Sequence, residues 1–81
     1  MSRSLLNRIV IDPNVMLGKP VIRGTRITVE IILEKLAADI PTEEILADYP
    51  RLTRKDILAA IAYAREAIAT EEFIPRVAAR G

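Results

Sequence analysis

The sequence has no cysteine, no histidine and no tryptophan, and each absence excludes a class of protein. Zinc fingers, thiolate clusters, haem ligation, Cys–His nucleophiles and Ser–His–Asp triads all need residues that are missing. Disulfides cannot form, which fits a reducing compartment. The longest apolar run is far shorter than the roughly 20 residues of a membrane span, and residues 1–8 lack the apolar segment of a signal peptide. We therefore expect a cytoplasmic protein with no metal, no cofactor and no membrane contact.

Aromatic residues are scarce as well. Tyr49, Tyr63 and Phe73 are the only ones among 81 residues, although 51% of the chain is hydrophobic, so the core must be aliphatic. This length fits one domain spanning residues 1–81. A domain of this size buries only about 60% of its unfolded surface and gains stability from self-association, which favours a homodimer.

The net charge of +1 hides an uneven distribution. Residues 1–27 carry a net charge of +4, residues 28–50 carry −5, and residues 51–81 carry +2. A basic end, an acidic middle and a mildly basic end predict a polarised surface. Ordinary solvated helix faces would give the same pattern, so charge alone does not assign a partner.

Residues 8–27 have the pattern of a small β-hairpin. A β-branched run at residues 8–11 stops at Asp12 and Pro13, and residues 21–22 can form a second short strand. Pro20 has no amide N–H to donate to a neighbouring strand. It must therefore lie on an edge strand or at the first residue of a strand. Two strands are too little sheet to stand alone, so a second chain or another partner is expected to cover the edge near Val21.

From Thr28 onwards the spacing of apolar residues is helical. Thr28 is expected to cap a first helix that runs to about residue 38, and Thr42 to cap a short second helix that ends before Pro50. Thr53 and Asp56 form a capping-box pattern that opens a third helix over residues 54–69. On this helix we expect one buried face formed by four residues at helical spacing, namely Ile57, Ile61, Ala64 and Ile68. Residues 28–69 thus predict a mostly α, three-helix bundle preceded by the hairpin, with a tail at 70–81.

Residues 43–69 have the layout of a helix-turn-helix: a short helix, a four-residue turn and a longer capped helix. The second helix of such a unit presents its first residues to the major groove, which here means Thr53, Arg54 and Lys55, with Arg51 in the turn. Arginine can read guanine edges, and lysine and threonine suit phosphates. Asp56 and the acidic second helix argue against DNA binding. Any three-helix bundle also needs turns and caps, and an arginine or lysine on an exposed first turn is usually just solvated.

Gly24, Thr25 and Arg26 form a corner between the hairpin and the first helix, because glycine allows a sharp turn there. Arg26 is expected to contact Glu30 or Glu34, although a ligand contact is the other interpretation.

The acids fall at helix starts and on exposed faces, and the segment Gly18 to Pro20 lacks the spacing of a phosphate loop. We therefore expect no enzyme activity.

Three motifs resemble the domain-of-unknown-function 433 family. They are Ile9-x-Ile11-Asp12-Pro13 followed by Gly18-x-Pro20-x-Ile22-x-Gly24-Thr25-Arg26-Ile27-x-Val29, then Asp48-Tyr49-Pro50-x-Leu52-Thr53, and Asp56-Ile57-x-Ala59-Ala60-x-x-Tyr63-Ala64. The resemblance spans residues 8–75. It implies a homeodomain-like three-helix fold after a small hairpin, and an antitoxin-like partner of a PIN-like nuclease. It assigns no catalytic residue, and Gly18, Pro20, Gly24, Thr25 and Arg26 are its structural motif.

The resulting hypothesis is a DNA-binding antitoxin that regulates its own operon as a homodimer. Double-stranded DNA would contact Arg51, Thr53, Arg54 and Lys55, and a PIN-like nuclease toxin would contact the edge near Val21 or the apolar pair Phe73 and Ile74. The alternative is a protein-interaction adaptor without DNA-binding activity, which the near-neutral net charge and the acidic middle segment favour. An enzyme ranks third, since it would need a metal site built from carboxylates alone.

Overall fold

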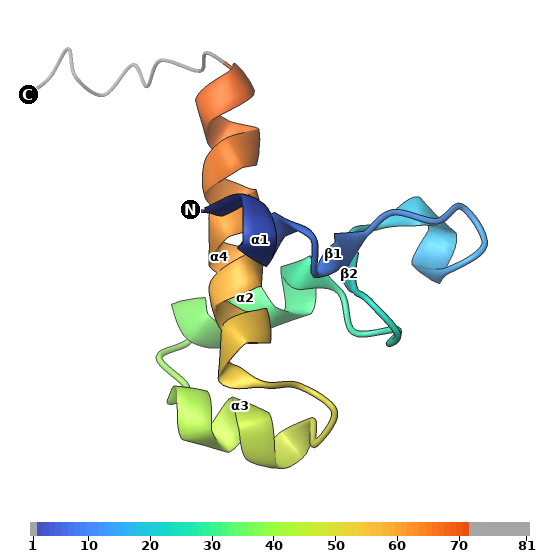
Figure 1. Cartoon of the computed structure of the whole chain (residues 1–81). Coiled ribbons are helices and arrows are strands. Elements are labelled where there is room, and N and C mark those ends of the chain that lie inside the picture. Colours follow the sequence, from blue (N-terminus) through green and yellow to red (C-terminus); the bar gives the residue numbers. More distant parts are fainter. Residues whose placement is uncertain (1, 72–81) are drawn as a thin grey trace, which may run out of the picture.

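The computed structural model describes residues 2–71, in which four α-helices pack together and a two-stranded hairpin lies to one side of them (Figure 1). The elements follow the chain as α1 (Ser2–Leu6), β1 (Ile9–Val10), the short turn η1 (Met16–Gly18), β2 (Val21–Ile22), α2 (Val29–Ala37), α3 (Thr42–Asp48) and α4 (Arg54–Glu71). The expected fold class, a mostly α bundle preceded by a short β-hairpin, is confirmed.

The hairpin is antiparallel and pairs Ile9 with Ile22 and Val10 with Val21. The second edge of β2 is not free, because Val21 forms a bridge with Thr28 and the Ile22 amide donates to the carbonyl of Ile27 over 3.0 Å. Val21 itself is buried. The edge predicted to hold a partner chain is therefore occupied by the segment that leads into α2.

The ends of the helices follow their local sequence. The Thr28 hydroxyl accepts from the Ile31 amide over 3.0 Å and caps α2 as expected. At the other end Asp39 adopts a left-handed conformation with φ 65°, and the Ile40 amide reaches back to the Lys35 carbonyl over 3.1 Å. The prediction for α3 was wrong by one residue: Thr42 is its first helical residue, and the preceding proline is an N-cap with no side-chain hydrogen bond.

The core is aliphatic, as the scarcity of aromatic residues predicts. One buried cluster joins β2, α2, α3 and α4, and it consists of Ile22, Val29, Ile32, Ile45, Leu52, Ile57 and Ala60. Tyr49 and Tyr63 pack against its edge. Ile32 and Ile45 are the largest fully buried side chains, so α2 and α3 each contribute one of them to the centre of the core.

The helix α1 has no counterpart in the predicted elements. It packs against α4, and in Figure 1 it crosses that helix near its middle. This contact covers a side of α4 that a three-helix bundle would leave exposed. On α4 Ala59 is fully buried, whereas Ile61 and Ile68, which were expected in the core, are exposed.

The turn η1 has an unusual backbone. Met16, Leu17 and Gly18 have φ angles of 49°, 58° and 82°, so three consecutive residues are left-handed. Glycine takes this conformation readily, but for methionine and leucine it is strained. The side chain of Leu17 is 93% exposed and gains no packing from it.

Candidate nucleic-acid interface

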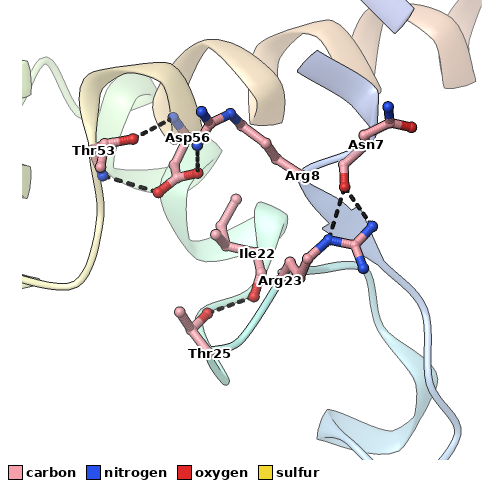
Figure 2. A network of polar contacts seen from close by, with 7 residues as sticks. All are labelled: Asn7, Arg8, Ile22, Arg23, Thr25, Thr53 and Asp56. Carbon is pink, nitrogen blue, oxygen red and sulfur yellow. Dashed lines mark hydrogen bonds and ion pairs between the residues drawn. The ribbon is translucent and has the colours of Figure 1, made fainter. Parts of the chain in front are cut away.

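The first turn of α4 is fixed by the predicted capping box. The Thr53 amide donates to Asp56 Oδ2 over 2.9 Å, and the Asp56 amide donates to Thr53 Oγ1 over 3.3 Å. Arg8 Nη1 reaches Asp56 Oδ1 at 3.0 Å from the start of the hairpin, and Figure 2 shows the three residues meeting. Asp56 is only 5% exposed, so its carboxylate points into the protein and leaves the outer surface of this turn without its charge.

Arg54 and Lys55 are exposed on the same turn. The nearest acid to Arg54 is Glu43, whose carboxylate lies 3.9 Å from Nη2, and both side chains are solvated. Such a pair contributes little energy, so the guanidinium can exchange Glu43 for another partner. Within residues 2–71, Lys55 has no ion pair.

Arg51 does not join this pair. Its Nη2 donates to the carbonyl oxygen of Gly24 over 2.8 Å, which ties the turn before α4 to the turn of the hairpin. The four residues predicted to contact DNA therefore divide between two places: Thr53, Arg54 and Lys55 at the start of α4, and Arg51 beside Gly24.

The hairpin corner has the structural role predicted for Gly24 and Thr25. Gly24 has a φ of 79°, which favours glycine. The Thr25 hydroxyl donates to the Ile22 carbonyl over 2.8 Å, as drawn in Figure 2, and accepts from the Ile27 amide over 3.0 Å. These bonds turn the chain out of β2 and into the capped start of α2.

The expectation that Arg26 contacts Glu30 or Glu34 was wrong. Lys19 Nζ lies 3.2 Å from Glu30 Oε1 instead, and Arg26 is exposed with no ion pair or side-chain hydrogen bond to any residue from 2 to 71. The remaining motif residues are structural. Gly18 supplies a positive φ, and the Pro20 carbonyl accepts from the Val29 amide over 2.9 Å.

Arg23 is a residue that sequence reasoning did not single out. Its Nε and Nη2 donate to the backbone carbonyl of Asn7, a contact visible in Figure 2. Arg23, Arg26 and Arg51 line one open cavity at the Gly24 turn. The sequence shows Arg23 and Arg26 on either side of Gly24, which could have indicated a basic site. Arg51 could not be added to them, because it is far from them along the chain.

Two features of the surface oppose binding to a polyanion. Glu43, Glu44 and Asp48 are exposed on α3, the helix that precedes the turn. On α4, Leu58 and Ile61 are exposed beyond the basic first turn. Arg26, Arg51, Arg54 and Lys55, at the Gly24 turn and at the start of α4, are exposed and remain available to phosphates.

Other kinds of site find no support within the described range. Residues 2–71 contain no group of three acidic, histidine or cysteine side chains that could hold a metal ion. No helix in the same range has the length and apolar character needed to cross a membrane. Phe73 and Ile74, predicted to contact a partner, lie outside the described residues.

Comparisons with known proteins give a family and a related structure. A family model described as "Protein of unknown function (DUF433)" matches residues 9–64. The chain is also similar to the crystal structure of a DUF433 member protein from Anabaena variabilis ATCC 29413, with 37% sequence identity and a TM-score of 0.73. This similarity covers 84% of the present chain and 67% of that chain. A comparison with curated proteins found no match.

Proposed function

This chain belongs to the DUF433 family, and we propose that it is a small DNA-binding, antitoxin-like protein whose α4 enters the major groove of its own operator. The observation that carries the proposal is the first turn of α4. Arg54 and Lys55 are exposed there, and the one acid of that turn, Asp56, is buried against Arg8. This arrangement removes the like-charge repulsion that Asp56 would otherwise exert on phosphates.

The geometry favours base contacts by Arg54 and phosphate contacts by Lys55. An exposed arginine at the start of a recognition helix can donate two hydrogen bonds to guanine, and a flexible lysine suits the backbone. The Thr53 hydroxyl accepts from the Asp56 amide and keeps its own proton to donate to a phosphate. No catalytic residue is part of this function.

The test is binding of the purified protein to its own upstream DNA and to a scrambled duplex of equal length, followed by fluorescence anisotropy at low and at physiological salt. We expect tighter binding to the operator, weakening as salt rises. Arg54→Ala should lose about tenfold in affinity and most of the preference for the operator, in line with about 1–3 kcal/mol for a good base contact.

The matched control is Arg65→Ala, which removes the same charge from an exposed arginine on the same helix. Arg65 lies eleven residues beyond Arg54, about 16 Å along the axis at 1.5 Å per residue. Equal affinities of the Arg54 and Arg65 variants for the operator would refute the role of Arg54. Absence of binding by the unmodified protein at low salt would refute the proposal as a whole.

The second half of the proposal is a PIN-like nuclease toxin as the protein partner, and the family resemblance supports it. Since β2 has no free edge, the proposed contact is Phe73 and Ile74. Truncation after Glu72 should abolish co-purification with a nuclease encoded beside this protein. Retention of the nuclease by the truncated chain would exclude these two residues as the contact.

An adaptor without DNA-binding activity is the second candidate, and the outer face of α4 favours it. Leu58, Ile61 and Ile68 are all exposed there, and exposed apolar side chains that line up along a helix mark protein contacts. Salt separates the two functions. An operator-binding protein loses affinity steeply as salt rises, whereas an adaptor binds neither duplex and holds its protein partner through apolar contacts.

A further inference from the structure

The Gly24 turn brings together three arginines from two distant parts of the chain. Arg23 and Arg26 flank the turn, and Arg51 arrives from the segment between α3 and α4. They line an open cavity of about 400 Å³, which far exceeds the roughly 30 Å³ that one water molecule occupies in the liquid. The cavity is large enough for a phosphate group.

Two of the three guanidinium groups are held in place by backbone carbonyls. Arg51 uses Nη2 on Gly24 and Arg23 uses Nε and Nη2 on Asn7. Each keeps further N–H donors, since a guanidinium has five. Neither is paired with a carboxylate within residues 2–71, so both retain their full charge for a ligand.

Arg26 is the third and is unengaged over the same range. Among residues 2–71, the only acid that lines the cavity is Asp12, whose Oδ1 accepts from the Asn14 amide over 2.9 Å. Three cations and one anion leave the lining with a net charge of +2.

From this arrangement we propose that the Gly24 turn is a phosphate-binding site formed by Arg23, Arg26 and Arg51. Arginine presents several donors in a plane and pairs with phosphate oxygens two at a time. The Arg51 contact with Gly24 places the site next to the turn that precedes α4. A DNA backbone phosphate as its ligand rests on the proposed operator binding, whereas a free phosphate does not.

The experiment compares the unmodified protein with Arg26→Ala and the control Arg65→Ala. Arg26 makes no side-chain contact that the fold depends on within residues 2–71, so its variant should fold, which circular dichroism checks. Affinity for a scrambled duplex is measured over a range of salt. Inorganic phosphate is titrated separately while the amide resonances of Gly24 and Arg26 are followed by NMR.

For DNA we expect Arg26→Ala to bind about three- to tenfold more weakly at physiological salt. Its slope of log affinity against log salt should be shallower by about 0.9, the value of one lost phosphate contact. Arg65→Ala should keep the slope of the unmodified protein. If the duplex binds and both variants have the same slope of log affinity against log salt, the site does not hold a backbone phosphate. If the protein also shows no response to inorganic phosphate, the proposed site is overturned.

The phosphate titration separates this inference from operator binding. Saturable shifts of the Gly24 and Arg26 amides in the unmodified protein, absent in Arg26→Ala, establish the site even if no duplex binds. In that case the ligand is a free phosphate and the operator hypothesis fails alone. If the protein binds neither duplex nor phosphate, both proposals are overturned.

Discussion

Asp56 shows how the position of one side chain changes the interpretation of a charge. In the sequence it is an acid on the helix expected to face DNA, and therefore an argument against DNA binding. In the structure its carboxylate accepts hydrogen bonds from the Thr53 amide and from Arg8. The charge is thus used to hold the hairpin onto α4 and to cap that helix.

Asp56→Ala should lower the free energy of unfolding by about 1–3 kcal/mol, because it removes an N-terminal capping partner and leaves the Thr53 amide without its acceptor. The same change removes the Arg8 ion pair that links the start of the hairpin to α4, and because the Arg8 side chain is partly exposed it leaves no fully buried unpaired cation. Urea denaturation followed by circular dichroism measures the change. Asp48→Ala, at an exposed acid of α3, should stay within about 0.5 kcal/mol of the unmodified protein; equal effects of the two variants would contradict this role for Asp56.

Leu17 gives a prediction of opposite sign. Its backbone is left-handed at φ 58° and its side chain is 93% exposed, so the residue is strained without packing in return. Leu17→Gly should raise the free energy of unfolding by about 0.5 kcal/mol. Glycine relieves about 1–2 kcal/mol of strain in the left-handed backbone, and its greater entropy in the unfolded chain offsets part of that gain. Leu17→Ala keeps the strain and should change nothing. A melting temperature that falls in the glycine variant would count against this strain.

At the scale of elements, α4 shows where the helical periodicity misleads. Ile57, Ile61, Ala64 and Ile68 have correct helical spacing, but the buried face is rotated towards Ile57, Ala59 and Ala60. Apolar residues occur on nearly every side of this helix, so the spacing does not select one face. The helix α1, which also packs against α4, was not predicted because five residues carry too weak a pattern.

Alanine substitutions test this rotation of α4. Ile57 is 3% exposed and Ile61 is 45% exposed. Ile57→Ala should cost about 2–5 kcal/mol of unfolding free energy, whereas Ile61→Ala should cost less than about 1 kcal/mol. Chemical denaturation of both variants under identical conditions gives the comparison. The opposite ranking would place Ile61 in the core and would mean that α4 is rotated.

Local rules were sufficient for most of the fold and for half of the candidate site. The capping residues Thr28 and Thr53 and the turn at Gly24 each act within a few positions of the chain, so their roles could be predicted. The Arg51 contact with Gly24 spans 27 positions and the Arg8 contact with Asp56 spans 48. Such contacts depend on tertiary packing, which neither composition nor spacing encodes. This is why Arg23 and the shared cavity were missed.

At the scale of the whole molecule, the surfaces separate into distinct regions. The basic groups gather at the Gly24 turn and at the start of α4. Acidic residues occupy α3, and exposed apolar residues follow the outer side of α4 towards Ile68. A molecule that contacts DNA at one end of α4 can therefore contact protein along the rest of that helix.

A homodimer stays a prediction, and the structure changes where its interface should lie. The edge of β2 is filled by the chain itself, whereas Leu58, Ile61 and Ile68 are exposed at spacings of three and seven residues, which place them along one side of α4. A second copy packed there would bury an apolar strip that begins at Leu58, one helical turn beyond Arg54 and Lys55. Two recognition helices could then reach successive half-sites of an operator.

Sedimentation equilibrium at micromolar concentration should give about twice the chain mass of 9.0 kDa. Ile68→Glu, at a position 67% exposed, should raise the dimer dissociation constant at least about tenfold, because an unpaired carboxylate in an apolar interface costs several kcal/mol. Leu17→Glu makes the same chemical change in the turn η1 of the hairpin and should leave the dimer intact, since the hairpin is outside the apolar strip of α4. A dimer that resists Ile68→Glu but dissociates with Leu17→Glu would place the interface on the hairpin instead. A monomeric mass at every concentration would exclude self-association. Each recognition helix would then have to bind its half-site without a partner copy.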